Sequence, residues 1–268
     1  MTTDGLAELA TRGVVEIDGD DDVRDDDAWH IGSCTKPISA LAWAQLVEGG
    51  YSSWDAPVAE VFDDVDCHIA FHNVTMTQLL QCRAGLPANP SFRANTRAHR
   101  DDRPVVEQRT GLVEQLLAEA PTRPGTFEYS NLSYIVLGAA IDRLTETSYE
   151  AHIEQQILTP LGIDDTGFGP APRIVGHKPG FALGRKGFSR PLWSMGNQDN
   201  AEVFNSAGRL HLSLESWSKF IELTLSGGAP LIGPDSLAKL TTPPATGDFA
   251  MGWGRQSTGS CLCKAATP

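Results

Sequence analysis

Two stretches of this sequence are apolar on almost every face of the helices that they predict. Residues 34–48 contain Ile38, Leu41 and Trp43 and end at a Gly-Gly pair, and residues 131–144 have the same character. A helix that is apolar all round must be covered by other elements, so both stretches belong in a protein interior. At 268 residues, the chain is long enough to bury two such helices in one folding unit.

Shorter helices and a few strands complete the predicted arrangement. Thr75 and Gln78 form a capping box ahead of a short helix that ends by Gly85. Further helices are predicted over residues 111–120, 149–158, 214–225 and 236–240. Residues 170–200, rich in Gly, Pro and Arg, are typical of long loops. Strand-like patterns are confined to the two ends of the chain, as at residues 14–17.

The charge balance excludes several classes of partner. Acidic residues outnumber basic ones by 34 to 21, and the net charge of −13 repels nucleic acid and anionic lipid. No apolar run approaches the roughly 20 residues that span a bilayer, and no basic segment followed by an apolar one opens the chain. Five cysteines without a framework spacing are typical of a reduced compartment. The sequence therefore predicts a cytoplasmic protein with no disulfides and no nucleic-acid or membrane partner.

Ser33 and Lys36 stand at the mouth of the first apolar helix. They are three positions apart, so they share one helical face and the amine can reach the hydroxyl. A serine hydroxyl is a weak nucleophile that needs an adjacent base to take its proton. The helix N-terminus and the apolar surroundings both disfavour a charged ammonium, which favours the neutral amine that can serve as this base. The alternative is a surface-reaching lysine beside a helix-capping serine.

Tyr129 and Asn131 mark the entrance of the second apolar helix. They offer a phenol and an amide at a helix mouth, as Ser33 and Lys36 offer a hydroxyl and an amine. A phenol near a cation can shuttle protons. The alternative is that Asn131 caps its helix while Tyr129 packs its ring, and capping is compatible with catalysis.

These two motifs, in this order, resemble those of the serine β-lactamase and penicillin-binding-protein superfamily, specifically its class C-like branch of esterases and peptidases. Residues 29–36 (WHIGSCTK) are similar to the family's approach to its nucleophile. Residues 124–131 (PGTFEYSN) are similar to the segment that delivers its tyrosine. Further resemblances cover residues 74–87, 205–210 and 249–253.

The resemblance implies a fold of the α/β (α+β) class, β-lactamase/transpeptidase-like. An antiparallel sheet built from the two chain ends would be flanked by helices, with a mainly helical lobe at about 55–205 inserted in the sheet-bearing lobe of a single domain, 1–268. Ser33 would be the acylated nucleophile, Lys36 its base partner and Tyr129 a proton relay. Asn131 would hold the substrate or Lys36. Backbone N–H groups of Ser33 and of a strand near the third family motif would form the oxyanion hole.

The family's third motif, K-T-G or H-x-G on a strand, is matched least well. Its nearest counterpart is residues 264–267 (KAAT), where Ala266 replaces the glycine that lets a substrate lie close to the strand. Lys264 and Thr267 are therefore the substrate-binding candidates from this motif. Lys178, followed by Pro-Gly, competes with Lys264 but falls out of family order. The termini are short for the family, so the sheet is expected to be incomplete.

Three other classes of protein or site are alternatives to this interpretation. The sequence contains no G-x-S-x-G, so no nucleophile elbow supports an α/β-hydrolase. A zinc site built from Cys67, His68, His72 and Cys82 matches no structural zinc spacing. The remaining alternative is a catalytically impaired remnant that binds a ligand or a partner protein without turnover, which the departures at the third motif favour.

The prediction is thus a serine hydrolase that acts through an acyl-enzyme on Ser33. Its partner would be a small ester or amide substrate, as for an esterase, a D-alanyl-D-alanine carboxypeptidase or a β-lactamase-like enzyme. No metal and no organic cofactor are expected. The sequence fixes neither the choice among these substrates nor the oligomeric state.

Overall fold

The computed structural model describes residues 5–6, 8–16, 19–175, 177–179, 189–191, 199–255 and 261–262. Its α-helices are α1 (Thr35–Glu48), α2 (Val58–Val61), α3 (Met76–Leu80), α4 (Phe92–Ala98), α5 (Val105–Ala118), α6 (Asn131–Thr145), α7 (Tyr149–Ile153), α8 (Asn205–Gly208), α9 (Leu214–Leu225) and α10 (Pro234–Thr241). Its strands are β1 (Ala28–His30), β2 (Gly167–Phe168), β3 (His177–Pro179), β4 (Ser189–Pro191), β5 (Leu210–Ser213), β6 (Gly254–Arg255) and β7 (Cys261–Leu262). A 3-10 turn, η1 (Gly32–Cys34), links β1 to α1.

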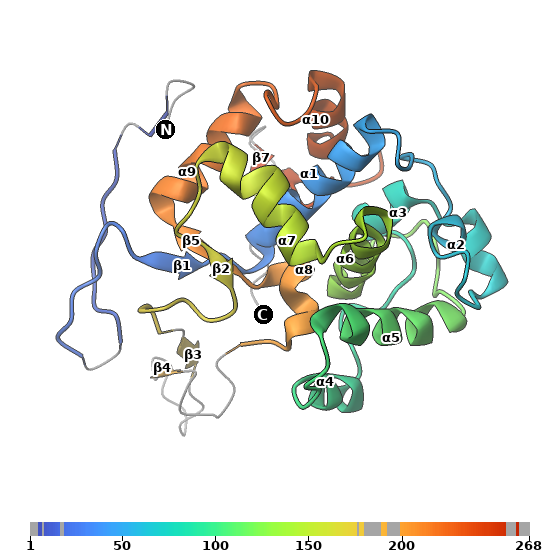
Figure 1. Ribbon diagram of the computed structural model, residues 1–268, viewed down its shortest axis with the longest axis horizontal. Coiled ribbons are helices and arrows are strands. Elements are labelled where there is room, and N and C mark those ends of the chain that lie inside the picture. Colours follow the sequence, from blue (N-terminus) through green and yellow to red (C-terminus); the bar gives the residue numbers. More distant parts are fainter. Residues whose placement is uncertain are drawn as a thin grey trace.

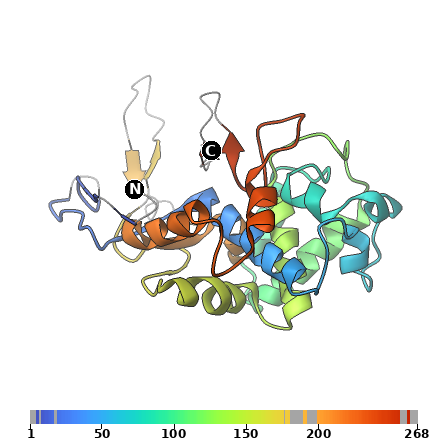
Figure 2. The same cartoon turned by 90° about the horizontal axis from the view of Figure 1, so that it is seen from above.

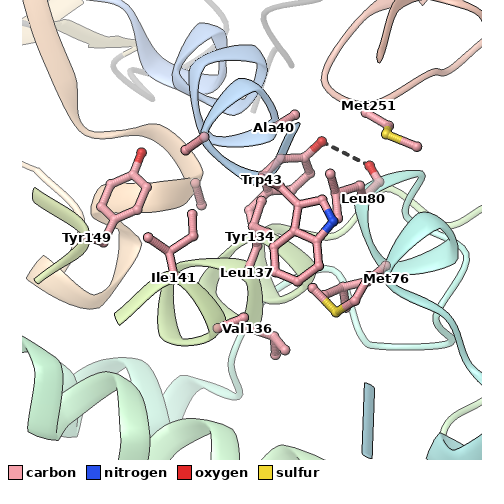
Figure 3. Packing of buried hydrophobic residues seen from close by; sticks show 14 of the residues in the cluster. Ala40, Trp43, Met76, Leu80, Tyr134, Val136, Leu137, Ile141, Tyr149 and Met251 are labelled. Carbon is pink, nitrogen blue, oxygen red and sulfur yellow. Dashed lines mark hydrogen bonds between the residues drawn. The ribbon is translucent and has the colours of Figure 1, made fainter. Parts of the chain in front are cut away.

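The two apolar helices predicted from the sequence are α1 and α6, and both are buried along most of their length. They contact each other and also α8, while α1 contacts α10 as well. Trp43 of α1 and Tyr134, Leu137 and Ile141 of α6 lie in the shared core (Figure 3). The Tyr134 hydroxyl donates to the Leu80 carbonyl oxygen at 2.9 Å, which also ties α6 to α3 (Figure 3).

The main sheet of the described residues is small and antiparallel, with the strand order β1-β5-β2. Strands β3 and β4 form a separate pair, and so do β6 and β7. In Figure 1 the β1-β5-β2 sheet lies to the left and helices α2 to α5 lie to the right, and the view from above keeps this separation (Figure 2). The turn η1, which contains Ser33, joins β1 to α1, so the nucleophile candidate stands where the sheet meets the helices.

A buried ion-pair cluster joins three helices of the helical part. The Arg109 side chain, on α5, is fully buried and donates to both oxygens of Asp142 on α6 and to both oxygens of Glu150 on α7. Asn205 of α8 donates to Glu150 at 2.8 Å. The cluster therefore fixes α5, α6, α7 and α8 relative to one another.

Most sequence predictions of elements are confirmed. The apolar helices and the helices at 214–225 and 236–240 are present, and Thr75 and Gln78 form both bonds of the capping box. The α+β class and the small, incomplete sheet are confirmed as well. The division into one domain with an inserted helical lobe stays a prediction.

Two predictions of local structure are wrong. Strands were expected only at the chain ends, yet β2, β3 and β4 lie within residues 167–191, most of which was predicted as loop. Such short strands leave a weak pattern, and their pairing depends on distant partners. Helix α5 begins six residues before the predicted start at Gly111, because one interior glycine costs only about 1 kcal/mol and does not stop a helix. At the predicted strand 14–17, Val14 forms an isolated bridge with Asp22.

The helices of the described residues are short for a membrane-spanning segment. Within the described ranges, none combines the length and the apolar composition needed to cross a membrane. The longest, α6, has 15 residues.

Candidate active site

Ser33 lies in the turn between β1 and α1, and this turn is fixed to the sheet. Gly32 has a φ of +52°, in the left-handed region that favours glycine, and it reverses the chain just before Ser33. Thr35 Oγ1 donates to the Gly32 carbonyl oxygen at 2.7 Å and accepts from the Leu210 N–H at 3.3 Å. The Ile31 N–H donates to the Leu210 carbonyl oxygen at 3.0 Å. The half-buried Ser33 hydroxyl is thus carried on a braced turn.

Lys36, one helical turn later, is 1% exposed. Its Nζ donates to Ser33 Oγ at 3.0 Å, to Asn131 Oδ1 at 2.7 Å and to the Ala207 carbonyl oxygen at 2.5 Å. These three neutral oxygens come from η1, α6 and α8, and an ammonium has three N–H donors to meet them. The helices that enclose the core therefore converge on a single amine beside the serine hydroxyl.

Two aromatic rings line the other side of this amine. The Nζ atom of Lys36 lies 4.9 Å from the ring centroid of Tyr129 and 5.4 Å from that of Tyr134. Both distances are within the range of a cation–π interaction. The structure thus brings the Tyr129 ring to Lys36, and the relay role of its phenol stays a prediction.

Asn131 is positioned by the segment just before α4. Its backbone N–H donates to the Ala88 carbonyl oxygen at 2.8 Å, and its side-chain Nδ2 donates to Asn89 Oδ1 at 2.7 Å. These bonds leave Oδ1 directed at Lys36. Ser130, rather than Asn131, caps α6, because its Oγ accepts from the Ser133 N–H at 3.1 Å. The capping role considered for Asn131 therefore falls to its neighbour.

The loop that delivers Tyr129 is held from two sides. The Glu128 N–H donates to the Cys82 carbonyl oxygen at 2.9 Å. Arg83 donates to the carbonyl oxygens of Gly125 at 2.8 Å and Thr246 at 3.3 Å, so one guanidinium links this loop to the segment before β6. The Tyr129 position thus depends on residues more than 40 positions before it and more than 100 after it.

The segment 249–253 closes the site on the side of α1. The Phe249 ring meets Tyr129 edge-on at 5.8 Å and Phe127 at 5.4 Å, which forms an aromatic wall beside the amine. Gly252 has a φ of +88°, and a Cβ there would lie 2.6 Å from the Pro37 nitrogen and 2.9 Å from the Lys36 carbonyl carbon. Only a glycine lets this backbone rest on the first turn of α1.

Of the six site residues predicted from the sequence, four lie in this cluster: Ser33, Lys36, Tyr129 and Asn131. Lys264 and Thr267 lie outside the described residues, so their substrate-binding role stays a prediction. The strand β7 ends two residues before Lys264 and pairs antiparallel with β6. The competing Lys178 is in β3, which pairs with β4 apart from the main sheet.

Sequence reasoning missed three contributors to the site. The Ala207 carbonyl oxygen leaves no signal in a sequence, because any residue supplies one. Asn89 is an ordinary loop residue until the fold brings it to Asn131. Tyr134 had a detectable signal, since it follows Asn131 by three positions and must share its helical face.

The zinc hypothesis finds no support among the described residues, where no three metal-ligating side chains gather. Cys82 is buried and its thiol donates to the Ser130 carbonyl oxygen at 3.7 Å. Burial raises the pKa of this thiol to about 11, which disfavours the thiolate that binds metals. The His68 ring accepts from the Ala70 N–H in its own turn.

Comparisons with known proteins identify the family of this chain. The Beta-lactamase family model matches residues 3–260, so the chain belongs to the Beta-lactamase family. This match confirms the resemblance noted in the sequence, and it defines the chain as a member of a family that includes serine hydrolases.

Curated relatives show the same kinship at the level of sequence. Esterase EstB of Burkholderia gladioli is 28% identical over 175 residues, which cover 59% of this chain and 42% of that protein. Protein flp of Staphylococcus aureus (strain N315) is 27% identical over 206 residues, covering 72% of this chain and 38% of that protein. The chain spans less than half the length of these relatives.

Solved structures show the same fold. The D-amino acid amidase from Ochrobactrum anthropi SV3, complexed with L-phenylalanine amide, superposes with a TM-score of 0.72 at 20% identity. The match covers 95% of this chain and 75% of the amidase. The β-lactamase/transpeptidase-like fold predicted from the sequence is therefore confirmed.

Proposed function

We propose that this chain is a serine hydrolase that cleaves a small ester or amide through an acyl-enzyme on Ser33. The observation that supports this most directly is the 3.0 Å contact between Ser33 Oγ and the amine of a lysine that is 1% exposed. A buried amine in hydrogen-bond reach of a serine hydroxyl is the pairing that a serine nucleophile needs.

The proposed acylation begins with Lys36 in its neutral form. The Ser33 hydroxyl then donates to the amine, so the 3.0 Å contact runs opposite to its direction with an ammonium. As Ser33 Oγ bonds to the substrate carbonyl carbon, Lys36 takes the hydroxyl proton. When the tetrahedral intermediate collapses, the leaving alcohol or amine takes a proton from Lys36, directly or through the Tyr129 phenol. Water then attacks the ester, and the reverse proton transfers restore Ser33.

Developing negative charge on the substrate oxygen requires backbone donors. The Ser33 N–H, in the 3-10 turn at the start of α1, is the first proposed donor. The second would come from the strand near Lys264, whose own role in holding the substrate stays a proposal. Asn131, bonded to Lys36 and Asn89, would orient the amine and touch the substrate.

The substrate class is proposed from the relatives and from the site. An esterase is among the sequence relatives, and D-amino acid amidase shares the fold, so a carbonyl compound with an alcohol or amine leaving group is the shared chemistry. The aromatic wall of Phe127, Tyr129 and Phe249 suits an apolar group beside the reacting carbonyl. Short p-nitrophenyl esters are the first substrates to test.

Intact-protein mass spectrometry after incubation with a fluorophosphonate tests the acyl-enzyme. We expect one covalent adduct on the wild type and none on Ser33→Ala. The matched control is Ser53→Ala, which removes an exposed loop serine and should keep the adduct. A folded wild type that forms no adduct contradicts the proposal and favours the remnant that binds a ligand without turnover.

The relay role of Tyr129 has its own test. We expect Tyr129→Phe to slow acylation by about 100-fold if the phenol transfers protons, because general acid–base groups contribute about that much or more. The variant keeps the ring that packs against Phe249 and Lys36. Stopped-flow acylation with a p-nitrophenyl ester measures the change, and an unchanged rate removes Tyr129 from the mechanism.

A further inference from the structure

His30, the last residue of β1, binds the turn that carries Ser33. Its Nδ1 accepts from the Gly32 N–H at 3.2 Å, and its Nε2 lies 3.1 Å from Asp199 Oδ2. The family resemblance assigned it no role, and the proposed mechanism does not use it. It stands two residues before the glycine and three before the nucleophile, and its ring bonds directly to the turn.

The two bonds fix which nitrogen of His30 carries a proton. A backbone N–H can only donate, so Nδ1 must be the unprotonated nitrogen. The proton of the neutral ring is then on Nε2, which donates to Asp199. An imidazolium would place an N–H of its own against the Gly32 N–H, so the bond to Gly32 exists only while His30 is neutral.

Asp199 is itself held by a chain of bonds that reaches the buried core. Arg209, which is 8% exposed, donates from Nε to the same Asp199 oxygen at 3.0 Å and from Nη1 to Asn205 Oδ1 at 2.7 Å. Asn205 donates to Glu150, a partner of Arg109. The carboxylate that orients His30 is therefore anchored to the α5–α8 cluster and not to the surface.

Asp199 is ionised beside the His30 ring. Burial raises the pKa of Asp199, but the hydrogen bond from His30 and the charge of Arg209 outweigh it and hold this pKa below its usual range. The carboxylate accepts from Nε2, and the Gly32 N–H requires the unprotonated Nδ1 of a neutral ring. The third titratable group on this side is His211, the β5 residue paired with His30, whose Nδ1 donates to the Gly169 carbonyl oxygen at 3.1 Å.

We propose that His30 is a positioning residue for Ser33: as a neutral ring it holds the Gly32 N–H and keeps the nucleophile in reach of Lys36, and protonation releases the turn. This inference rests on the proposed function, because it concerns the rate at which Ser33 is acylated. Gly32 is already in the left-handed region, so a lost bond changes the φ and ψ angles that aim the next residue. The bond forms as pH rises through the protonation range of His30 and is lost as pH falls.

The first experiment reads the ring without using activity. Long-range ¹H–¹⁵N spectra of the wild type should show the Nε2–H tautomer of His30 in alkaline buffer. On acidification, the Gly32 amide signal should titrate together with the His30 ring. An Nδ1–H tautomer, or a Gly32 amide that does not follow the ring, overturns the proposal even if the protein proves to be inactive.

The second experiment compares two substitutions of His30. The Oδ1 atom of Asn sits two bonds from Cβ, as Nδ1 of His does, so His30→Asn keeps an acceptor for Gly32 that no proton can block. His30→Leu removes the acceptor. Above about pH 8, where free imidazoles are neutral, we expect His30→Leu to slow fluorophosphonate acylation of Ser33 by about 10- to 100-fold and His30→Asn to stay near the wild type.

The pH profile separates positioning from mere support of the fold. Below neutrality the wild-type rate should fall more steeply than that of His30→Asn, because only the wild type loses its acceptor for the Gly32 N–H when the ring is protonated. Asp199→Asn still accepts from Nε2 but lacks the negative charge, so the fall of its acylation rate should occur at lower pH than in the wild type. The control His72→Asn changes an exposed histidine of the 69–73 turn and should match the wild type.

The two proposals fail in different ways. A folded wild type that is not acylated refutes the proposed function, and the tautomer measurement then decides alone on His30. An acylated wild type whose pH profile is identical to that of His30→Asn, with His30→Leu unimpaired, refutes the positioning role and leaves the hydrolase intact.

Discussion

Two buried basic side chains, Lys36 and Arg109, differ in the partners that the fold provides for them, although burying a charge is costly for both. Both are within 1% of complete burial. Arg109 is bound to the carboxylates of Asp142 and Glu150, with four contacts of 2.7–3.0 Å. Lys36 donates to a hydroxyl, an amide and a backbone carbonyl.

The difference in partners agrees with a structural role for Arg109 and with the reactive role proposed above for Lys36. Burial lowers the pKa of Arg109, but the bonds to Glu150 and Asp142 outweigh it, so this pKa stands above the usual arginine value. A carboxylate partner stabilises a charge, while neutral oxygens around a desolvated amine let it lose its proton at lower cost. We therefore expect substitutions of Arg109 to affect stability and substitutions of Lys36 to affect chemistry.

The largest expected effect is on stability. Arg109→Met leaves the Asp142 and Glu150 carboxylates buried without their cation, so the free energy of unfolding should fall by about 3–5 kcal/mol. Urea denaturation followed by circular dichroism measures it. The control Arg123→Met removes an exposed guanidinium 3.9 Å from Glu128 and should change stability by no more than about 0.5 kcal/mol. If Arg109→Met lowered the free energy of unfolding by less than about 1 kcal/mol, the structural role assigned to Arg109 would be wrong.

The next effect is on the reaction. Lys36→Met fills the same volume without an amine, and acylation of Ser33 should slow by about 100-fold or more. Its unfolding free energy should fall by less than that of Arg109→Met, because Arg109 still binds the buried carboxylates of Asp142 and Glu150. Lys219→Met, at a partly exposed lysine bound to the Gly162 carbonyl oxygen, should leave acylation unchanged. Wild-type rates in Lys36→Met would contradict the base assignment.

A third prediction concerns the pH dependence of the Arg109 cluster. Burial raises the pKa of Glu150, but hydrogen bonds from Arg109 and Asn205 and the charge of Arg109 bring it below its usual value. A lowered folded pKa stabilises the protein above the unfolded value, about 4.3, and this contribution disappears as pH falls through the folded pKa. Glu150→Gln should therefore be less stable than the wild type at pH 7 by about 1.5–3 kcal/mol.

The difference between Glu150→Gln and the wild type should shrink in acid. Parallel urea titrations at several pH values give this curve directly. A difference that stays constant down to acid pH would show that Glu150 acts by shape rather than by charge. Asp142 is not suitable for the same test, because burial raises its pKa and works in the opposite direction.

The smallest expected effect concerns the partner of Lys36. Asn89→Ala removes the acceptor that orients the Asn131 amide, and acylation should slow by about 2- to 10-fold, the range of one neutral hydrogen bond. The exposed Asn73→Ala is the control and should not change the rate. A loss as large as that of Lys36→Met would mean that Asn89 itself reaches the substrate.

The parts of the fold with local causes were predictable from the sequence. The ends of α1 and α6 follow from apolar periodicity and their flanking residues, and the capping box at Thr75 needs only residues three apart. Strand β2 has two residues and pairs with β5 more than 40 positions away, so no local pattern encodes it.

The contacts of the site likewise include some that follow from local sequence and some that depend on distant residues. The Ser33–Lys36 contact follows from helical spacing, and the approach of Asn131 followed from a family resemblance. The Ala207 carbonyl oxygen lies 171 positions from Lys36, and the His30–Asp199 contact spans 169. Such contacts arise from the complete fold, which is why neither could be inferred beforehand.

The missing side chain at Gly252 has a consequence for how substrate range could change. Because the backbone at this position lies against the first turn of α1, an added methyl group would force the segment 249–253, which carries Phe249, to shift relative to that turn. Phe127, at the outer end of the same aromatic wall, is 43% exposed and has room to vary. In a combinatorial library over this wall, active variants should retain glycine at 252 and diversify freely at 127.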